Sequence, residues 1–215
     1  MDARLSPLTA QTAGGIHLQA ARSVFWELEP ELARRVAKAG NAPFEKEVWL
    51  STVLLTFGAC GFNIGFPRSE VPRRRARATV LYCPREDAPG ARQLPTAPVS
   101  EDAAVVTSLF IDPGFEGTGL EAVLMDAAIM DLLQKGVEAV EAFGWRKDAE
   151  DPLPMAEKPQ DIGLIDAAVL ESAGFEVVRD HPVLPRLRLE MPPAKGLLSA
   201  EAVEKLLSGA EAHVS

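Results

Sequence analysis

The sequence predicts a single-domain α/β protein, on the basis of its composition, its changing hydrophobic periodicity and one strand, helix, strand unit in the middle of the chain. Of the 215 residues, 47% are hydrophobic and 25% are charged. These proportions are typical of a globular domain that buries its own core. No internal repeat and no second-domain boundary is visible, so we expect residues 1–215 to form one domain.

Charge and cysteine content restrict the class of protein. The net charge of -9 argues against general binding to nucleic acid or to anionic membranes, because both need many Lys and Arg side chains. Cys60 and Cys83 have no spacing typical of a zinc site or a disulfide framework, which favours a reducing compartment. No signal peptide and no membrane-spanning run is recognisable. We therefore expect a cytoplasmic protein.

The first half of the chain predicts two helices and two strands. Residues 15–26 are compatible with a short strand, and residues 29–39 with a helix that has Pro30 in its first turn. A second amphipathic helix is expected over 43–57, with these apolar residues at helical spacing: Phe44, Val48, Leu50, Val53, Leu54 and Phe57. Residues 60–66 and 77–82 read as adjacent strands. The proline-rich residues 84–100 predict a long loop, either a lid or a flap over a site.

The second half carries clearer signals. Residues 103–111 predict a strand, 120–135 a helix and 137–145 a second strand, and the short turns between them imply a parallel pair with a right-handed crossover. The residues expected to face inward on that helix are Val123, Leu124, Ala127, Ala128, Met130 and Leu132. A helix over 164–173 and strands from 175 and 186 follow. Residues 199–208 predict a surface helix with Ser199 as its N-cap.

The segment SLFIDPGFEGTGLEAVL places a strand, a glycine-bearing turn and a helix N-terminus in succession. The first N–H groups of a helix lack partners within the helix, and the helix dipole makes that end positive. Gly117 and Gly119 allow the backbone to approach a ligand closely. Two glycines in such a turn also occur for steric reasons alone, so this pattern leaves phosphate binding and simple chain geometry open.

The order of elements and these residues together resemble the GNAT superfamily of N-acetyltransferases. In that family a strand similar to SLFIDP leads into a glycine-bearing loop whose amides hold the pyrophosphate of acetyl-CoA. The later segment LESAGFEVV looks like the family's closing helix and strand, and GVEAVEAFG and HPVLPRLRLEM resemble a poorly characterised actinobacterial branch. The resemblance is firmest over residues 103–191. It implies a mixed, mostly antiparallel sheet with one splayed parallel pair and helices on both faces.

The resemblance also implies a function and a site. We expect acetyl-CoA as co-substrate, without a metal, and direct attack by a primary amine of a small molecule or a protein, since no Cys or Ser is placed as a nucleophile. A homodimer is compatible with the fold. The main chain expected to hold the pantetheine belongs to Leu109, Phe110 and Ile111. The residues expected to meet the pyrophosphate are Phe115, Glu116, Gly117, Thr118, Gly119, Leu120 and Glu121.

Two carboxylates depart from the family pattern. Glu116 stands where the family has Gln or Arg, and Glu121 replaces the usual Gly or Ala. Each unit-charge repulsion at 4 Å costs about 1 kcal/mol in water and about 4 at a shielded surface, against a helix-end attraction of about 0.3 to 1 kcal/mol. If both side chains point inward, repulsion prevails. If they point outward, the amides stay available, and Glu121 is then a favourable first-turn residue.

This departure leaves a second function open, namely a catalytically degenerate GNAT-fold protein that binds a partner or another ligand. The transferase hypothesis requires an open pocket at the amides that begin the helix at Leu120. A pocket filled by Glu116 or Glu121 would contradict that hypothesis while leaving the fold unchanged. In addition, Leu170 occupies the place of the Tyr that protonates the thiolate in many members of the family, and Tyr82 would replace it only if its hydroxyl reached the cleft.

Amine attack needs a proton acceptor near neutral pH. Glu141 is the first candidate, because a carboxylate within the apolar run of residues 137–145 is paired, functional or at a sheet edge. A structural ion pair with an Arg is the alternative. Glu27, beside Trp26, is the second candidate, with an exposed carboxylate at a helix start as its alternative. His181 is expected to be a loop residue, and His17 is expected to have no catalytic role.

Overall fold

The computed structural model describes residues 3–65 and 75–212, with side chains up to residue 210. Within these ranges a mixed eight-stranded sheet runs in the order β1-β2-β3-β4-β5-β8-β7, with β6 beside β5. The strands are β1 (Arg4–Pro7), β2 (Gly61–Gly65), β3 (Ala78–Pro84), β4 (Ala103–Ile111), β5 (Ala139–Trp145), β6 (Ile165–Asp166), β7 (Glu176–Arg179) and β8 (Arg186–Glu190).

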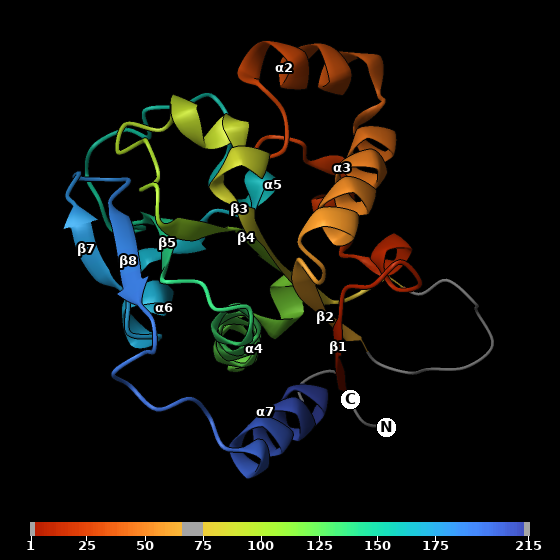
Figure 1. Ribbon diagram of the computed structural model, residues 1–215, viewed down its shortest axis with the longest axis vertical. Helices are drawn as coiled ribbons and strands as arrows, with labels where there is room; N and C mark the ends of the chain where they lie inside the picture. The colour runs from red at the N-terminus through yellow and green to blue at the C-terminus, as the bar shows by residue number, and fades with distance from the viewer. Residues whose placement is uncertain (1–2, 66–74, 213–215) are drawn as a thin grey trace.

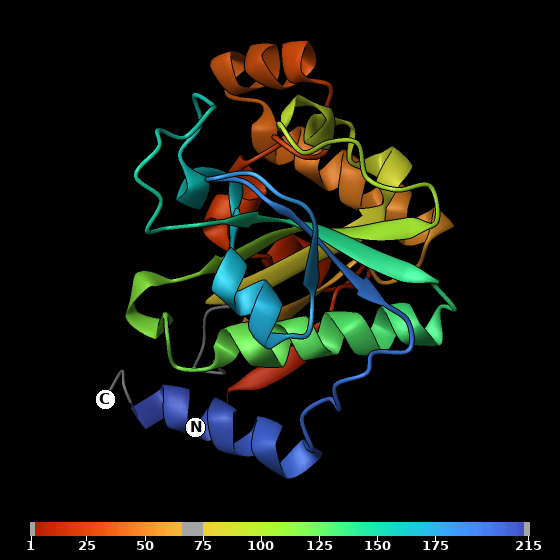
Figure 2. The same cartoon turned by 90° about the vertical axis from the view of Figure 1, so that its left-hand side faces the viewer.

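Helices cover both faces of this sheet (Figures 1 and 2). One face packs against α1 (Leu18–Arg22), α3 (Ala42–Thr56) and α5 (Pro159–Ile162), with α2 (Pro30–Ala39) beside α3. The other face packs against α4 (Leu120–Gln134) and α6 (Ala167–Ser172), and α7 (Ala200–Ala212) packs on α4. Short 3-10 turns occupy Ala13–Gly15, Arg85–Asp87, Pro89–Gln93 and Pro113–Phe115. The predicted architecture, a mostly antiparallel sheet between two helical layers, is confirmed.

The predicted parallel pair is β4 and β5, joined through α4. Their ladder runs only from Ala103 to Val106 on β4, opposite Ala139 to Ala142 on β5. Beyond Val106, β4 continues to Ile111 on its β3 side alone, and the register with β3 shifts at Thr107, which is typical of a β-bulge. The end of β5 pairs instead with β6. The two strands therefore diverge towards their C-terminal ends.

Residues 15–26 contain the short helix α1 (Leu18–Arg22) and no strand, so the prediction of a strand there is wrong. The five residues of α1 have the sequence LQAAR, which is rich in helix formers, and its Ala20 and Ala21 are buried. The His17 side chain accepts a hydrogen bond from the Gln19 N–H at 3.2 Å and so caps the helix. A capped turn with two small buried residues packs closely against α3, which outweighs the local preference of the flanking apolar residues.

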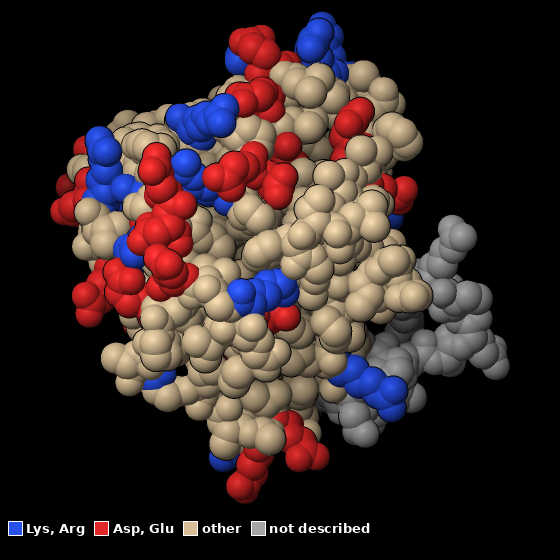
Figure 3. All heavy atoms as spheres, in the orientation of Figure 1, with Lys and Arg blue, Asp and Glu red and all other residues tan. Residues whose placement is uncertain are grey.

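The predicted helix over residues 43–57 is α3, but a different face of it is buried. Leu50 and Val53 are buried as expected, whereas Phe44 is 65% exposed and Val48 46% exposed. Lys46 is buried instead because it forms an ion pair with the buried Glu27, and this contact turns the helix away from the apolar stripe. The surface over α3 is mostly uncharged in Figure 3.

The proline-rich segment at residues 84–100 packs as part of the core. Its Gly90 N–H donates to the Trp26 carbonyl at 3.0 Å, and its Thr96 hydroxyl donates to the Leu184 carbonyl at 3.0 Å. Ala91 and Leu94 are buried. Because these contacts anchor it against the α1 and α3 face, the expectation of a lid or flap over a site is wrong.

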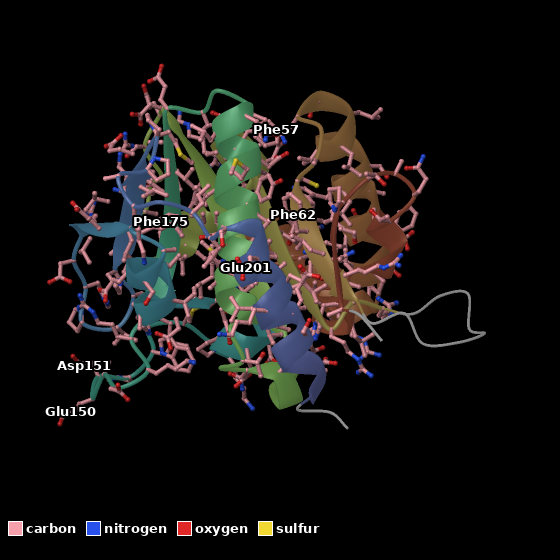
Figure 4. All side chains as sticks on the ribbon, turned by 90° about the horizontal axis from the view of Figure 1, so that it is seen from below. Phe57, Phe62, Glu150, Asp151, Phe175 and Glu201 are labelled. Carbon is pink, nitrogen blue, oxygen red and sulfur yellow. The ribbon has the colours of Figure 1, made fainter. Side chains whose placement is uncertain are left out.

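The C-terminal helix α7 lies along α4, as Figure 4 shows from below, with Phe175 on one side of α4 and Phe57 and Phe62 on the other. Its predicted cap is confirmed, since the Ala202 N–H donates to the Ser199 hydroxyl oxygen at 3.2 Å. On α4, Met130 is exposed, contrary to the prediction, and the buried residues that the prediction missed are Leu120, Met125 and Ile129. No helix among the described residues is long and apolar enough to cross a membrane.

Candidate functional site

A cleft of about 690 Å³ opens where β4 and β5 diverge. Its walls are the end of β4, the turn and first residues of α4, one side of α6 and the linker residues 195–198 that lead to α7. The geometry follows from the sheet, because two parallel strands that separate leave a gap which their flanking helices do not fill. The cleft is large enough for a cofactor-sized ligand.

Most residues that the sequence predicts for cofactor binding line this cleft. Those that do so are Leu109, Phe110, Ile111, Glu116, Gly117, Gly119 and Glu121. Phe115 and Leu120 instead point into the core below α4. Thr118 turns its hydroxyl towards its own loop, where it donates to the Phe115 carbonyl at 2.7 Å. Whether the lining residues bind a cofactor remains a prediction.

One backbone donor on the cleft side of β4 already has a partner. The Leu109 N–H donates to the Gly163 carbonyl at 2.8 Å, across the gap between the strands. Gly163 lies so close to Phe110 that a Cβ there would meet the Phe110 ring at 2.6 Å, and its φ of +66° is in the left-handed region. Alternate residues of a strand direct their N–H and C=O groups to the same side, so Ile111 directs both groups into the gap.

The N-terminus of α4 forms one end of the cleft. Gly119 adopts φ +91° as N-cap without a side-chain cap, and Leu206 of α7 packs against its outer side. In the described part of the chain, the N–H groups of Gly119, Leu120 and Glu121 have no acceptor. The Gly117 N–H, however, donates to Glu121 Oε1 at 2.8 Å. One loop amide is therefore occupied by the chain's own carboxylate, while the cleft around it is open.

The charged groups that line the cleft are mainly acidic. They are Glu116, Glu121, Asp126 and Asp166, together with the cations Lys147 and Lys195. Asp126 accepts the Leu198 N–H at 2.5 Å, and Asp166 pairs with Lys147 at 3.0 Å. Lys195 donates to the Ser172 carbonyl. Of the four carboxylates, Glu116 alone has no hydrogen bond to another described residue.

The two carboxylates predicted as proton acceptors lie outside the cleft lining. Glu141 is fully buried and pairs with Arg186 and, at 3.4 Å, with Arg188, and it also accepts the Ser100 N–H at 3.1 Å. Glu27 is buried and pairs with Lys46. Both arrangements are structural ion pairs, which for Glu141 is the alternative that the sequence left open. Neither position offers a proton acceptor to a ligand in the cleft.

Neither Tyr82, the candidate for a substitute acid, nor Leu170, which stands in the place of the family's Tyr, lines the cleft. Tyr82 is buried, and its hydroxyl donates to Asp131 Oδ2 at 2.6 Å. Burial, together with this hydrogen bond, raises the pKa of the Tyr82 phenol well above its usual range. Leu170 is fully buried on α6. The condition for Tyr82 to act as a substitute acid, a hydroxyl that reaches the cleft, is not met.

His17 is the functional candidate that the sequence interpretation missed. Its ring lines the cleft, stacks on Phe110 with ring centroids 5.8 Å apart, and forms a hydrogen bond from Nε2 to Asp112 Oδ1 at 2.8 Å. Asp112 also pairs with Arg77 at 2.7 Å. No local pattern joins two residues 95 positions apart, so this contact was beyond sequence reasoning. His181 is a loop residue, as expected, since its Nδ1 accepts the N–H groups of Val183 and Leu184.

The described residues contain no group of three or more His, Cys, Asp or Glu side chains that could hold a metal ion. Cys60 and Cys83 are both free and buried, and burial raises the pKa of the Cys60 thiol to about 12. Neither thiol lines the cleft.

No protein-family model matches the sequence, and no curated protein matches it significantly. Solved structures do resemble the chain. The PaiA N-acetyltransferase of Thermoplasma acidophilum in complex with coenzyme A has 10% identity and a TM-score of 0.54, over 88% of this chain and 99% of that one. An N-acetyltransferase from Staphylococcus aureus Mu50 has 11% identity and a TM-score of 0.53, over 88% and 99%. The NatC complex bound to Gag peptide and CoA has 12% identity and a TM-score of 0.52, over 89% and 99%.

Each likeness extends over nearly the whole length of the solved chain. At 10 to 12% identity the likeness concerns the fold. The chain therefore has the fold of the GNAT acyl-CoA N-acyltransferases.

Proposed function

We propose that the protein transfers an acetyl group from acetyl-CoA to a primary amine by direct attack. The observation that carries this proposal is the cleft at the divergence of β4 and β5, which joins the end of β4 beyond its ladder with β5 to the N-terminus of a long helix. Two solved proteins of the same fold are described as complexes with coenzyme A.

The cleft offers donors suited to each part of such a co-substrate. Ile111 directs its N–H and C=O into the gap, where an amide-containing pantetheine chain would form strand-like hydrogen bonds. The N–H groups of Gly119, Leu120 and Glu121 begin α4 at the positive end of its dipole, where a diphosphate is stabilised. The apolar side chains of Leu109 and Leu164 line the cleft as well.

The chemistry assigned to the protein is positioning and charge stabilisation. The amine nitrogen attacks the thioester carbonyl, the C–S bond breaks, and the thiolate leaves with CoA. With Glu141 and Glu27 held in ion pairs, the proton released by the amine passes to water in the open cleft. No covalent acyl-enzyme is required, since neither thiol of the chain lines the cleft.

Binding of CoA tests the proposal first. Ligand at about 100 times its Kd adds about 2.7 kcal/mol to the free energy of unfolding, which raises Tm by about 5 to 10 °C for a chain of this size. We expect this shift with millimolar CoA and with acetyl-CoA. An unchanged Tm with both would favour the alternative, a GNAT-fold protein that binds a partner and catalyses nothing.

A variant that fills the cleft locates the binding. Ala168 is an exposed residue of the cleft wall on α6, and a Trp at this position would fill the cleft. Ala168→Trp should therefore abolish the rise in Tm with CoA. It should also abolish the release of free CoA from acetyl-CoA in the presence of an amine mixture. Ala39→Trp, on the exposed end of α2, is the matched control and should behave like the wild type. Equal shifts in both variants would place the ligand elsewhere.

A further inference from the structure

We propose that Glu121 is an internal competitor for the cofactor: its carboxylate occupies the loop amide of Gly117 and must swing away before the diphosphate of CoA binds. This inference rests on the proposed function and assigns to the same cleft a built-in autoinhibitory contact. It concerns one residue that lines the cleft and one amide of the turn before α4.

The geometry of the turn makes the contact possible. Gly117 adopts φ +72°, which directs its N–H back towards the start of α4, and Glu121 lies four residues further along, in the first turn of the helix. Glu121 Oε1 accepts that N–H at 2.8 Å. A carboxylate oxygen and a phosphate oxygen are both anionic acceptors, so they compete for the same donor.

Glu116 and Glu121 lie at the same end of the cleft but differ in this contact. Both residues line the cleft, and both carry a charge that repels an incoming anion. Only Glu121 holds a loop amide, since Glu116 is exposed and has no hydrogen bond to another described residue. Removal of either charge relieves repulsion, whereas removal of the Glu121 charge also weakens competition for the Gly117 amide. Comparing variants of Glu116 and Glu121 therefore separates the effect of charge on CoA affinity from the effect of the contact with Gly117.

The cleft's cations do not offset these carboxylates. Lys147 is paired with Asp166, and Lys195 donates to the Ser172 carbonyl. A diphosphate that enters this end thus depends on backbone N–H groups. Of these, the Thr118 N–H donates to the Phe115 carbonyl at 3.3 Å, and the Gly117 N–H is the one held by a side-chain carboxylate. The side chain of Glu121 is half-buried at the cleft surface and can rotate towards solvent without disturbing the core.

The test compares the affinity of CoA for the wild type, Glu121→Gln and Glu116→Gln by isothermal titration calorimetry at low ionic strength. Loss of one repulsive charge at about 4 Å in water corresponds to about fivefold tighter binding. We expect about fivefold for Glu116→Gln and more than tenfold for Glu121→Gln. Dephospho-CoA, which keeps the diphosphate but lacks the 3′-phosphate, should show the same ranking.

The outcomes are distinct from those that test the proposed function. If the wild type binds CoA and Glu121→Gln binds it no more tightly than Glu116→Gln, the competition is refuted while the proposed function stands. If only Glu121→Gln binds measurably, the competition is supported directly. If neither variant nor wild type binds CoA at millimolar concentration, both the proposed function and the competition are refuted.

Discussion

The carboxylates at the two ends of the β4 and β5 pair differ in their partners. At the closed end, where the strands form a ladder, the buried carboxylate of Glu141 meets Arg186 and Arg188. At the open end, where they diverge, carboxylates gather around helix amides that have no acceptor among the described residues. Among the described residues, Glu116 and Glu121 at the open end form no ion pair, whereas Glu141 at the closed end forms two.

This difference shows why a buried carboxylate in a strand is a poor guide to chemistry. Glu141 is the most buried acidic residue near the cleft, yet its partners come from β8, the strand paired to β5 on its other side. Its two cationic partners compensate a charge that would otherwise be buried alone. The residues that can act on a ligand are those at the open end, where burial is lower and partners are incomplete.

The largest expected loss of stability is at the closed end, for a substitution of Glu141. Glu141→Gln leaves the Arg186 guanidinium without its carboxylate, and among the described residues only the Ser100 hydroxyl, at 3.4 Å, remains as a partner of that guanidinium. Breaking a buried ion pair costs about 3 to 5 kcal/mol. We expect the free energy of unfolding, measured by urea denaturation, to fall by that amount.

The double variant Glu141→Leu with Arg186→Met is the control for this prediction. Removing both charges avoids an unpaired buried cation, so its stability should exceed that of Glu141→Gln. A loss below about 1 kcal/mol in the single variant would mean that the pair behaves like a surface contact, and the contrast between the two ends would disappear.

The open end is expected to depend on backbone geometry more than on charge. Gly163→Ala introduces a Cβ at 2.6 Å from the Phe110 ring, at a φ of +66°. A left-handed conformation costs an L-residue about 1 to 2 kcal/mol, and overpacking adds about 1 to 3. We expect a loss of about 2 to 4 kcal/mol in urea denaturation.

Gly40→Ala separates the two causes. Gly40 has a φ of +75° and nothing within 4 Å of the position of a Cβ, so it should lose only the conformational part, about 1 to 2 kcal/mol. Equal losses of stability at Gly40 and Gly163 would indicate that the close approach of Gly163 to Phe110 contributes nothing. The packing of Gly163 between β4 and β5 would then be loose.

The fold was predictable because its signals are local. The strand, turn and helix from Ala103 to Gln134 follow from periodicity and from glycine placement, and the observed bounds of β4 are those predicted. The errors came where a distant contact decided the outcome. Lys46 rotates α3 by pairing with Glu27, and the residues 84–100 are fixed by contacts with Trp26 and Leu184.

The candidate site was predictable only along its continuous stretch. Residues Leu109 to Ile111 and Glu116 to Glu121 are adjacent in sequence, so one motif identifies both. His17 and Gly163 reach the cleft from segments far away in the chain, through hydrogen bonds to Asp112 and Leu109. No spacing rule connects such residues, because their proximity is set by the order of strands in the sheet.

The smallest expected change in stability concerns Glu121, and its sign distinguishes competition from a purely structural role. A carboxylate in the first turn of a helix stabilises it by about 0.3 to 1 kcal/mol. Glu121→Gln should therefore lower Tm slightly, by about 1 to 4 °C for a chain of this length, in a thermal melt without ligand. Glu116 lies before α4 and contacts no amide of the described chain, so Glu116→Gln should change Tm less. With saturating CoA, Glu121→Gln should instead have a higher Tm than the wild type. In this variant the diphosphate no longer competes with a carboxylate for the Gly117 N–H, so CoA stabilises it more. A Glu121→Gln protein that stays below the wild type both with and without CoA would make the carboxylate a helix-stabilising residue and nothing more.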